Sequence, residues 1–395
     1  MIRDPVVFAS AARTPMGSFQ GIFSGISAVE LGAAVIRAAL ERAKVEPEVV
    51  QEVFMGCVLP AGLGQAPARQ AGLKAGIPIS VPCSTINKVC GSAMKAAMLA
   101  HDLISLGTAD IMVAGGMESM TNAPYMLEKG RTGYRLGHGR VLDHMVFDGL
   151  EDAYDKGKLM GEFAEDIATQ YGLTREAQDQ YAITSLTRAR QAVEDDTFSK
   201  EVTPVTVQGR KGETIGVDQD EAPLKVKPEK IPHLKPAFRK NGTITAGNAS
   251  AISDGAAALV LMRLSEAERR GLMPLALIRG HVQVAQEPAL FTTAPIFALR
   301  KILKRVDWSV ADVDLYEIIE AFACVAMIAM QELGLPLEKV NIHGGACALG
   351  HPIGATGARI VVTLLAALQK YDLKRGIACL CIGGGEATAL AVERL

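Results

Sequence analysis

Short apolar runs alternate with alanine-rich stretches of helical spacing along most of this chain. Residues 6–9, 111–114 and 377–382 are apolar runs of strand length, whereas residues 92–106 and the stretch from about Ala355 have the spacing of helices. Strands that are apolar on both faces are buried between helices. The pattern therefore predicts an α/β fold built of stacked layers.

Part of this pattern occurs twice. Residues 91–116 run from a glycine through a helical stretch into a strand that ends in glycines, followed by a glutamate at position 118. Residues 354–384 repeat that order, with a glutamate at position 386. A repeat on the scale of half a chain indicates two similarly folded domains related by duplication.

The stretch between the two copies is richer in charge and turn residues. Within it, Thr174 is expected to cap a helix. The predicted domains are residues 1–118 together with about 249–270, an inserted loop domain at residues 119–248, and residues 271–395. Basic residues near the end of the insertion either form a solvated face or contact phosphates. They are Arg210, Lys211, Lys225, Lys227, Lys230, Lys235, Arg239 and Lys240.

Composition narrows the class of protein. The chain has 395 residues, of which 49% are hydrophobic, and its net charge of -2 provides no field that would attract nucleic acid or an anionic membrane. No stretch reaches the roughly 18 to 20 apolar residues of a membrane helix. The seven cysteines are scattered without a CxxC pair, and the chain starts without the pattern of a signal peptide. We therefore expect a cytoplasmic protein without a zinc site.

Cys90 is the first candidate for chemistry. It lies in the segment NKVCGSAMK (residues 87–95), directly before a helical run. Backbone amides and the helix dipole at such a position favour the thiolate, so we expect a lowered pKa and a nucleophilic sulfur. The alternative is a cysteine that is buried as a small apolar residue.

His351 lies in the segment HGGACALGHPIGATG (residues 343–357), which contains five glycines. Glycines cost conformational entropy, so this density implies close backbone packing around a ligand or a site. Pro352 biases His351 toward an extended conformation, which places its ring at the mouth of a loop. The alternative is a histidine that the backbone satisfies in a tight turn.

A third candidate segment ends the last apolar strand. Cys379 and Cys381 share one face of this strand, and Cys381, at its open end, is the better candidate. The glycine turn that follows, which includes Gly383, has bare amides that suit an oxyanion hole. A cysteine nucleophile, a histidine base and a second cysteine together fit a two-step acyl transfer.

These three segments, with GGMESM (residues 115–120) and NGTITAGNAS (residues 241–250), resemble the thiolase family, and most of all its acetoacetyl-CoA thiolases. The resemblance spans nearly the whole chain. It implies a five-layered αβαβα fold and reversible condensation of two acetyl-CoA molecules to acetoacetyl-CoA, or thiolysis of a short 3-oxoacyl-CoA. It also implies a homodimer or homotetramer that uses coenzyme A as substrate and product and needs no metal or redox cofactor.

The resemblance assigns roles to individual residues. Cys90 is the nucleophile, His351 activates it, Cys381 is the acid and base for the carbon acid, and the amides of Cys90 and Gly383 form an oxyanion hole. Phe291 forms a wall of the acyl pocket. The pantetheine tunnel is lined by Ser250, Ala249, Phe238, Met160 and Phe322, with the basic edge of the insertion near the nucleotide phosphates.

One departure from the family pattern affects the chemistry. Family members usually carry an asparagine where this chain has Ile319, and that asparagine holds a water of a second oxyanion hole. Loss of one oxyanion donor costs about 100- to 1000-fold in turnover. Two milder departures are Leu159, where a histidine is frequent, and Ala93, where a glycine is usual.

Ile319 keeps other functions open. One alternative is a thiolase homologue with impaired condensation, which acts as an acyl-CoA hydrolase or as an acyl-CoA-binding protein. A decarboxylating ketoacyl synthase fits poorly. Those enzymes pair the cysteine with two histidines, or with a histidine and an asparagine, and Cys381 occupies one of those places. The retained set of Cys90, His351 and Cys381 favours the thiolase interpretation.

Overall fold

The computed structural model describes residues 4–209 and 212–395. The predicted basic residues Arg210 and Lys211 lie outside the described residues. One sheet of ten strands runs through the molecule in the order β12-β13-β14-β11-β1-β10-β5-β3-β4, with β2 paired to β10. Its N-terminal half comprises β1 (Val6–Arg13), β2 (Gly17–Ser18), β3 (Glu52–Gly56), β4 (Cys83–Ile86), β5 (Ile111–Ser119) and β10 (Ser253–Arg263).

The C-terminal half of the sheet comprises β11 (Ala276–Ala285), β12 (Leu315–Ile318), β13 (Arg375–Ile382) and β14 (Glu386–Glu393). The two halves join where Val7 and Phe8 of β1 pair with Leu277 and Ala276 of β11. Both halves mix parallel and antiparallel pairs. Helices cover both halves, as predicted from the apolar strands.

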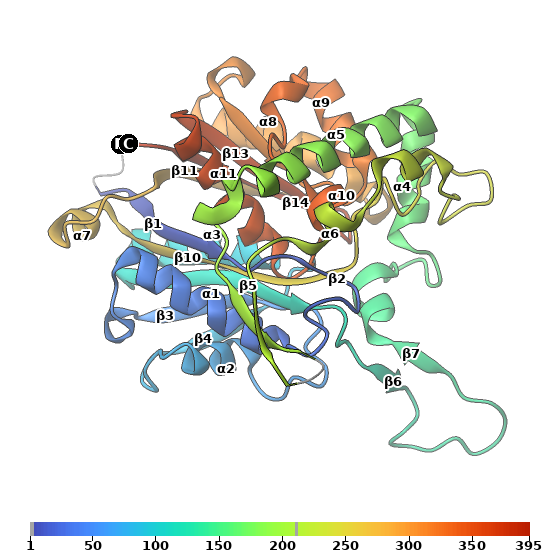
Figure 1. The fold of residues 1–395 in the computed structure, drawn as a ribbon, viewed down its shortest axis with the longest axis horizontal. Helices are drawn as coiled ribbons and strands as arrows, with labels where there is room; N and C mark the ends of the chain where they lie inside the picture. Colours follow the sequence, from blue (N-terminus) through green and yellow to red (C-terminus); the bar gives the residue numbers. More distant parts are fainter. Residues whose placement is uncertain (1–3, 210–211) are drawn as a thin grey trace.

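Helices form three further layers around the sheet halves (Figure 1). α1 (Ala28–Ala43) and α2 (Pro67–Lys74) cover the outer face of the N-terminal half, and α8 (Ala294–Val306) and α9 (Ala323–Leu333) cover the outer face of the C-terminal half. α3 (Ser92–Leu106) and α11 (Thr356–Lys370) lie between the halves. The predicted αβαβα layering is confirmed.

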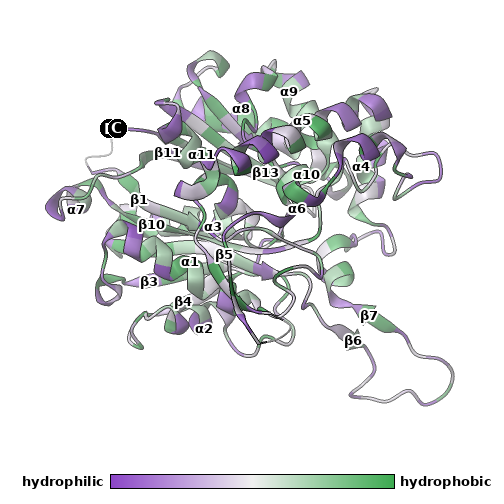
Figure 2. Ribbon diagram, viewed as in Figure 1, coloured by the Kyte–Doolittle hydropathy of each residue, from purple (hydrophilic) through white to green (hydrophobic). Residues whose placement is uncertain are grey.

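Strand alternation distributes the apolar side chains between these layers. In β1, Val6 and Phe8 face the central core around α3 and α11, whereas Val7 and Ala9 face the outer core around α1. The hydropathy colouring in Figure 2 shows apolar strands β5 and β10 at the centre and mixed colours along α5 at the periphery. The central core includes the first residues of α3, and Cys90, directly before this helix, packs against it.

The insertion between β5 and β10 covers one side of this core and projects an arm. It comprises β6 (Tyr125–Leu127), β7 (Val141–Asp143), β8 (Val205–Gln208), β9 (Thr214–Val217), α4 (Met160–Gln170), α5 (Arg175–Glu194) and α6 (Glu221–Lys225). β6 and β7 pair and extend away from the body (Figure 1). Thr174 caps α5 as predicted, because its hydroxyl accepts the Ala177 amide. The domain boundaries near residues 118, 248 and 270 stay a prediction.

Glycines allow the central helices and loops to approach closely. A Cβ atom on Gly116 of β5 would lie 2.0 Å from the carbonyl oxygen of Gly354, and one on Gly357 of α11 would lie 2.4 Å from the amide nitrogen of Met94 in α3. These contacts leave no room for a side chain. They bring the loop that carries His351 against the start of α3, as the glycine density predicted. The remaining short helices are α7 (Leu264–Arg269) and α10 (Ala346–Leu349).

Candidate active site

Cys90 lies in a tight turn directly before α3. Val89 has a φ of 46°, in the left-handed region that β-branched residues rarely adopt. Three hydrogen bonds hold the turn: the Val89 amide donates to Asn87 Oδ1 at 3.0 Å, the Lys88 amide donates to Ser92 Oγ at 2.8 Å, and Ser92 Oγ donates to the Val89 carbonyl at 2.6 Å. The strained turn fixes the position of the sulfur at the start of the helix.

Cys90 is half-buried and packs against the central core. Burial raises the pKa of this thiol to about 11, while hydrogen bonds from the backbone amides of Gly383 and Cys90 itself act in the opposite direction. The nearby carboxyl of Glu118 raises the pKa further. The predicted lowered pKa is wrong for the free protein, because removal from water outweighs the helix terminus. The thiol therefore needs a base.

The His351 loop is anchored on both sides. The His351 amide donates to the Ala251 carbonyl at 3.0 Å, and the Gly354 amide donates to Oε2 of Glu118 at 2.8 Å. Glu118 also accepts the amides of Val58 and Leu59 at 2.9 and 3.1 Å. A single buried carboxyl thus ties the loop after β3 to the loop that carries His351.

The protonation of His351 follows from its neighbours. Thr356 Oγ1 donates its only hydrogen to the Pro352 carbonyl at 2.9 Å, and it lies 2.6 Å from Nδ1 of His351. The hydroxyl oxygen of Thr356 therefore accepts a hydrogen bond from Nδ1 of His351. Nδ1 carries the hydrogen, and Nε2 carries a lone pair. Burial, together with the charge of Arg359, lowers the pKa of His351 to about 3, so the ring is neutral.

Nε2 of His351 is buried and has no hydrogen-bond partner among the residues that the structure describes. A buried polar atom without a partner is costly and is found where a ligand completes the site. The alternative of a histidine that the backbone satisfies in a tight turn is wrong, because Nδ1 pairs with the Thr356 side chain and Nε2 has no partner among the described residues. Nε2 is free to take a proton.

Cys381 lies at the end of β13 and packs in the same central core as Cys90. Burial raises its pKa well above the usual range, and the neighbouring thiols of Cys90, Cys379 and Cys324 raise it further. Cys379 instead packs beneath α8, where its Sγ lies 3.8 Å from the Pro295 carbonyl. Of the two strand cysteines, Cys381 is the one whose thiol interacts with Cys90.

The predicted tunnel residues also come together. The rings of Phe238 and Phe322 lie 5.9 Å apart between centroids, and those of Phe291 and Phe322 lie 6.5 Å apart. Ala249 pairs with Phe322 in an isolated bridge, and the Ser250 amide donates to the Ala321 carbonyl at 2.9 Å. The result is an aromatic cluster beside the backbone segment that precedes β10.

Met160 lies next to the glycine turn that follows Cys381. A Cβ atom on Gly383 would lie 3.5 Å from Met160 Sδ and 3.7 Å from Val89 Cγ1. The next residue, Gly161, packs against the ring of Phe238, which a Cβ atom would meet at 2.3 Å. The start of α4 therefore lies between the aromatic cluster and the glycine turn after Cys381.

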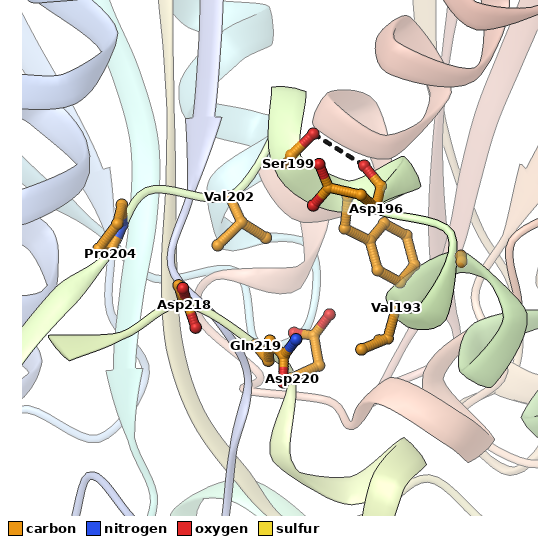
Figure 3. A pocket seen from close by; sticks show the side chains of 10 residues that line it. Val193, Asp196, Ser199, Val202, Pro204, Asp218, Gln219 and Asp220 are labelled. Atoms are coloured by element: carbon orange, nitrogen blue, oxygen red, sulfur yellow. Dashed lines mark hydrogen bonds between the residues drawn. The ribbon is translucent and has the colours of Figure 1, made fainter.

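A separate cavity of about 220 Å³ lies around Val193, Val202, Pro204 and Gln219 (Figure 3). Its lining includes three acidic residues, Asp196, Asp218 and Asp220, and Ser199 donates to the Asp196 carbonyl at 2.8 Å. It contains none of the predicted site residues. Its carboxylates would repel the phosphates of coenzyme A, so we do not assign it to the substrate.

Comparison with known proteins decides the family. Residues 6–265 match the family described as thiolase, N-terminal domain, and residues 272–394 match thiolase, C-terminal domain. The chain belongs to the thiolase family. An acetyl-CoA acetyltransferase of Cupriavidus necator is 50% identical over 98% of this chain and 99% of its own length, and one of Escherichia coli is 51% identical over 98% and 99%.

A solved thiolase has the same fold. The crystal structure of Acat5 thiolase from Ascaris suum in complex with coenzyme A has a TM-score of 0.93 and 41% identity, covering 99% of this thiolase chain and 100% of the other. The similarity therefore spans both halves and the insertion between them.

Two residues that shape this thiolase site were given no role by the sequence analysis. Thr356 stands inside the GHPxGxTG motif, and Glu118 ends the segment GGME. The position of Thr356 at the first turn of the helix after His351 was a usable signal, because such a hydroxyl can reach back to the preceding loop. Glu118 had no comparable local signal, since its partners are distant in sequence.

Ile319 is completely buried in the central core with Cys381 and Phe322. Its amide donates to the Cys379 carbonyl at 3.0 Å, which continues the pairing of β12 with β13. An isoleucine side chain has no donor or acceptor, so it cannot hold a water by hydrogen bonds. Ile319 therefore provides no polar side chain at the position where the resemblance led us to expect an asparagine.

Proposed function

We propose that this enzyme is an acetyl-CoA C-acetyltransferase that works through an acyl group on Cys90. One observation carries the proposal: Cys90 and Cys381 pack in the same central core, and the backbone amides of Cys90 and Gly383 act against the rise in the pKa of the Cys90 thiol. The close similarity to acetyl-CoA acetyltransferases supports acetyl-CoA and acetoacetyl-CoA as substrates.

The first step is acylation. Nε2 of His351 takes the Cys90 proton while Sγ attacks the substrate carbonyl, and the oxyanion that forms is held by the amides of Cys90 and Gly383. The high pKa of the thiol favours proton transfer that accompanies the attack over a preformed thiolate. In thiolysis the bond that breaks joins the keto carbon to the α-carbon, and the enolate of acetyl-CoA departs.

Cys381 handles the proton of the carbon acid. Because its pKa is raised, the resting group is a thiol, which can donate a proton to the departing enolate carbon. The resulting thiolate then takes the proton of the incoming coenzyme A, whose sulfur attacks the acetyl group. Cys90 is released as a thiolate and takes its proton back from Nε2 of His351. Condensation follows the same steps in reverse, with Cys381 as the base that removes a methyl proton.

Substrate binding follows the aromatic cluster. We assign the pantetheine arm to Ser250, Ala249, Phe238, Met160 and Phe322, because Phe322 contacts both Phe238 and Ala249, and Met160 lies near Gly383. Phe291 packs behind Phe322 and limits the acyl pocket. The basic residues near positions 225–240 suit the nucleotide phosphates, although Lys225 pairs with Glu221 and Arg239 pairs with Asp166.

The three-part domain division, the assembly and the compartment complete the proposal. We assign the nucleophile to residues 1–118 with 249–270, coenzyme A binding to residues 119–248, and His351 and Cys381 to residues 271–395.

The arm of β6 and β7 exposes Tyr125, Leu136 and Val141, which suits a homodimer or homotetramer. Free cysteines suit the cytoplasm. No described helix is long and apolar enough to cross a membrane.

The decisive experiment incubates the enzyme with acetoacetyl-CoA and coenzyme A, measures acetyl-CoA formation, and determines the mass of the Cys90 peptide. We expect turnover and acetyl-Cys90. The variant Cys90→Ala should lose both, whereas Cys83→Ala, on the edge strand β4, should keep both. A second incubation supplies acetyl-CoA alone, which can acetylate Cys90 without carbon–carbon cleavage. Acetyl-Cys90 from acetyl-CoA, without turnover of acetoacetyl-CoA, would instead support an acyl-CoA hydrolase or an acyl-CoA-binding protein, and acetylation that persists in Cys90→Ala would refute the nucleophile.

A further inference from the structure

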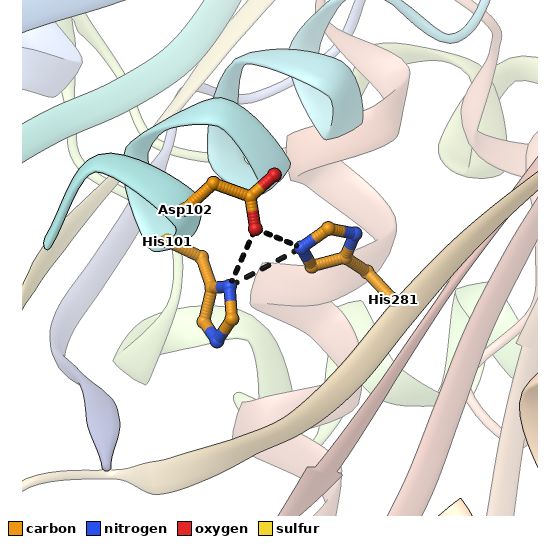
Figure 4. Close-up of side chains that lie close together, drawn as sticks. All are labelled: His101, Asp102 and His281. Atoms are coloured by element: carbon orange, nitrogen blue, oxygen red, sulfur yellow. Dashed lines mark hydrogen bonds and ion pairs between the residues drawn. The ribbon is translucent and has the colours of Figure 1, made fainter. Parts of the chain in front are cut away.

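Three side chains with metal-binding atoms meet between α3 and β11, away from the proposed chemistry. Nε2 of His281 lies 2.9 Å from Oδ1 of Asp102 and 3.2 Å from Nδ1 of His101, and His101 Nδ1 lies 3.2 Å from the same carboxylate oxygen. Figure 4 shows the three atoms turned toward a common centre. They could all hold one cation.

The triangle has the dimensions of one face of a tetrahedral zinc site. Zinc binds imidazole nitrogen and carboxylate oxygen at about 2.0 to 2.2 Å, so neighbouring ligands of a tetrahedron lie about 3.3 to 3.5 Å apart. The three observed separations are shorter by a few tenths of an ångström. Small rotations of the side chains are therefore enough to admit the ion.

The protonation states also suit a cation. Burial lowers the pKa of both His101 and His281, so both rings are neutral at pH 7, which is the form that binds metals. The two histidines lower the pKa of Asp102 against the effect of burial, so its carboxylate is ionised. The Asp102 side chain is 49% exposed, which leaves a path for the ion and a fourth position for water.

Hydrogen bonds can hold this cluster in two ways. Each neutral ring can donate to Oδ1 of Asp102, which leaves the two donor nitrogens facing each other at 3.2 Å. If His101 donates to His281 instead, the contacts of both rings with the carboxylate have no hydrogen between them. A cation at the centre would replace either arrangement by direct contacts with all three atoms.

One charge opposes the ion. Arg305, at the end of α8, lowers the pKa of both rings through its positive charge. It would also repel a bound cation, so it sets an upper limit on affinity. Removal of the Arg305 charge should therefore raise the affinity of the cluster for the cation. Random binding at the surface would not show this increase.

We propose that His101, Asp102 and His281 form a binding site for a divalent transition metal of the zinc class, with water as the fourth ligand. The site would link α3 of the N-terminal half to β11 of the C-terminal half. His101 is eleven residues after Cys90, about 16 Å along the helix, so the ion takes no part in the acyl chemistry. Its role is to hold the far end of α3 against the second sheet half.

The test measures Zn²⁺ binding to chelator-treated full-length protein by calorimetry, in a Cys90→Ser background so that the active-site thiol is not a ligand. We expect about one ion per chain. Co²⁺ should give the intense visible bands of a four-coordinate site at the same stoichiometry. Zn²⁺ should raise the melting temperature as its concentration exceeds the dissociation constant.

Three variants separate this site from adventitious binding. His281→Ala and the nearly isosteric Asp102→Asn should each weaken binding by more than about tenfold, and Arg305→Gln should strengthen it. The matched control is His138→Ala, since His138 is exposed in the arm and outside the cluster. Unchanged binding in Asp102→Asn and His281→Ala, or no binding to the parent chain, would overturn the proposal.

Discussion

The hydroxyl of Thr356 lies 2.6 Å from Nδ1 of His351 and, by donating to the Pro352 carbonyl, sets which ring nitrogen carries the hydrogen. The lone pair is thereby left on Nε2, the buried atom without a partner among the described residues. Thr356 is a positioning residue, since it acts on the reaction through His351.

Replacement of this hydroxyl should therefore reduce activity without unfolding the protein. Thr356→Val keeps the shape but removes the acceptor, so both tautomers become populated and one of them cannot act as base. We expect kcat/KM for thiolysis to fall about 10- to 100-fold. Thr356→Ser should restore most of it. Equal losses in the serine and valine variants would show that packing, and not the hydroxyl, is what matters.

The ionisation of Cys90 predicts an unusual pH profile in the free enzyme. Because burial raises its pKa to about 11, the thiolate fraction should still be rising at pH 10, where an ordinary thiol with a pKa near 8.5 is almost fully ionised. The rate of Cys90 alkylation by iodoacetamide, followed by mass spectrometry, should therefore still rise with pH up to about pH 10. Glutathione in the same tube is the reference, and a plateau below pH 9 would contradict the raised pKa.

Ile319 should limit the carbon–carbon step specifically. Ile319→Asn introduces a side chain that can hold a water, so turnover of acetoacetyl-CoA should rise, by about tenfold or more, while the rate of Cys90 acetylation by acetyl-CoA, which breaks no carbon–carbon bond, changes little. Burial of the amide should lower the free energy of unfolding by about 1 to 3 kcal/mol.

The matched control for this change is Ile319→Leu, which keeps the site apolar and should leave turnover near that of the parent. Single-turnover acetylation by acetyl-CoA measures acyl transfer to Cys90, and steady-state thiolysis of acetoacetyl-CoA measures carbon–carbon cleavage, so the two assays separate the two steps. An unchanged thiolysis rate in a folded Ile319→Asn variant would show that the enzyme stabilises the enolate without that water.

The close contact between β5 and the His351 loop predicts a stability effect. Gly116→Ala would place a methyl group 2.0 Å from the Gly354 carbonyl oxygen, so the loop must move. We expect the free energy of unfolding to fall by about 3 kcal/mol and thiolysis to fall with it. Gly25→Ala, where no atom lies within 4 Å of the added methyl, is the control for urea denaturation. Similar midpoints for the two variants would refute the steric argument.

Much of the fold could be predicted from local pattern. The strands at residues 6–9, 111–114 and 377–382 and the helix at residues 92–106 are present, as parts of β1, β5, β13 and α3. These elements are fixed by side-chain periodicity, which is a local property. The strands extend further than predicted because Gly115 and Gly116 continue the pairing of β5 with β10 and β3.

The candidate site was predictable in part. The family motifs predict Cys90, His351 and Cys381 as site residues, and the structure brings Cys90 and Cys381 into one core. The pKa of Cys90 was predicted in the wrong direction, because a helix terminus is visible in a sequence whereas burial is not. Glu118 was given no role, since its three amide partners lie at positions 58, 59 and 354.

The sequence by itself determined the layered α/β fold and the membership of the thiolase family, and it predicts Cys90, His351 and Cys381 as the reacting side chains, because each depends on short motifs and local periodicity. Only the tertiary structure decided the ionisation of Cys90, the tautomer of His351 and the meeting of His101 with His281, which lie 180 residues apart. These depend on burial and on distances between remote parts of the chain, and dehydration of a charged or titrating group is set by all the atoms around it.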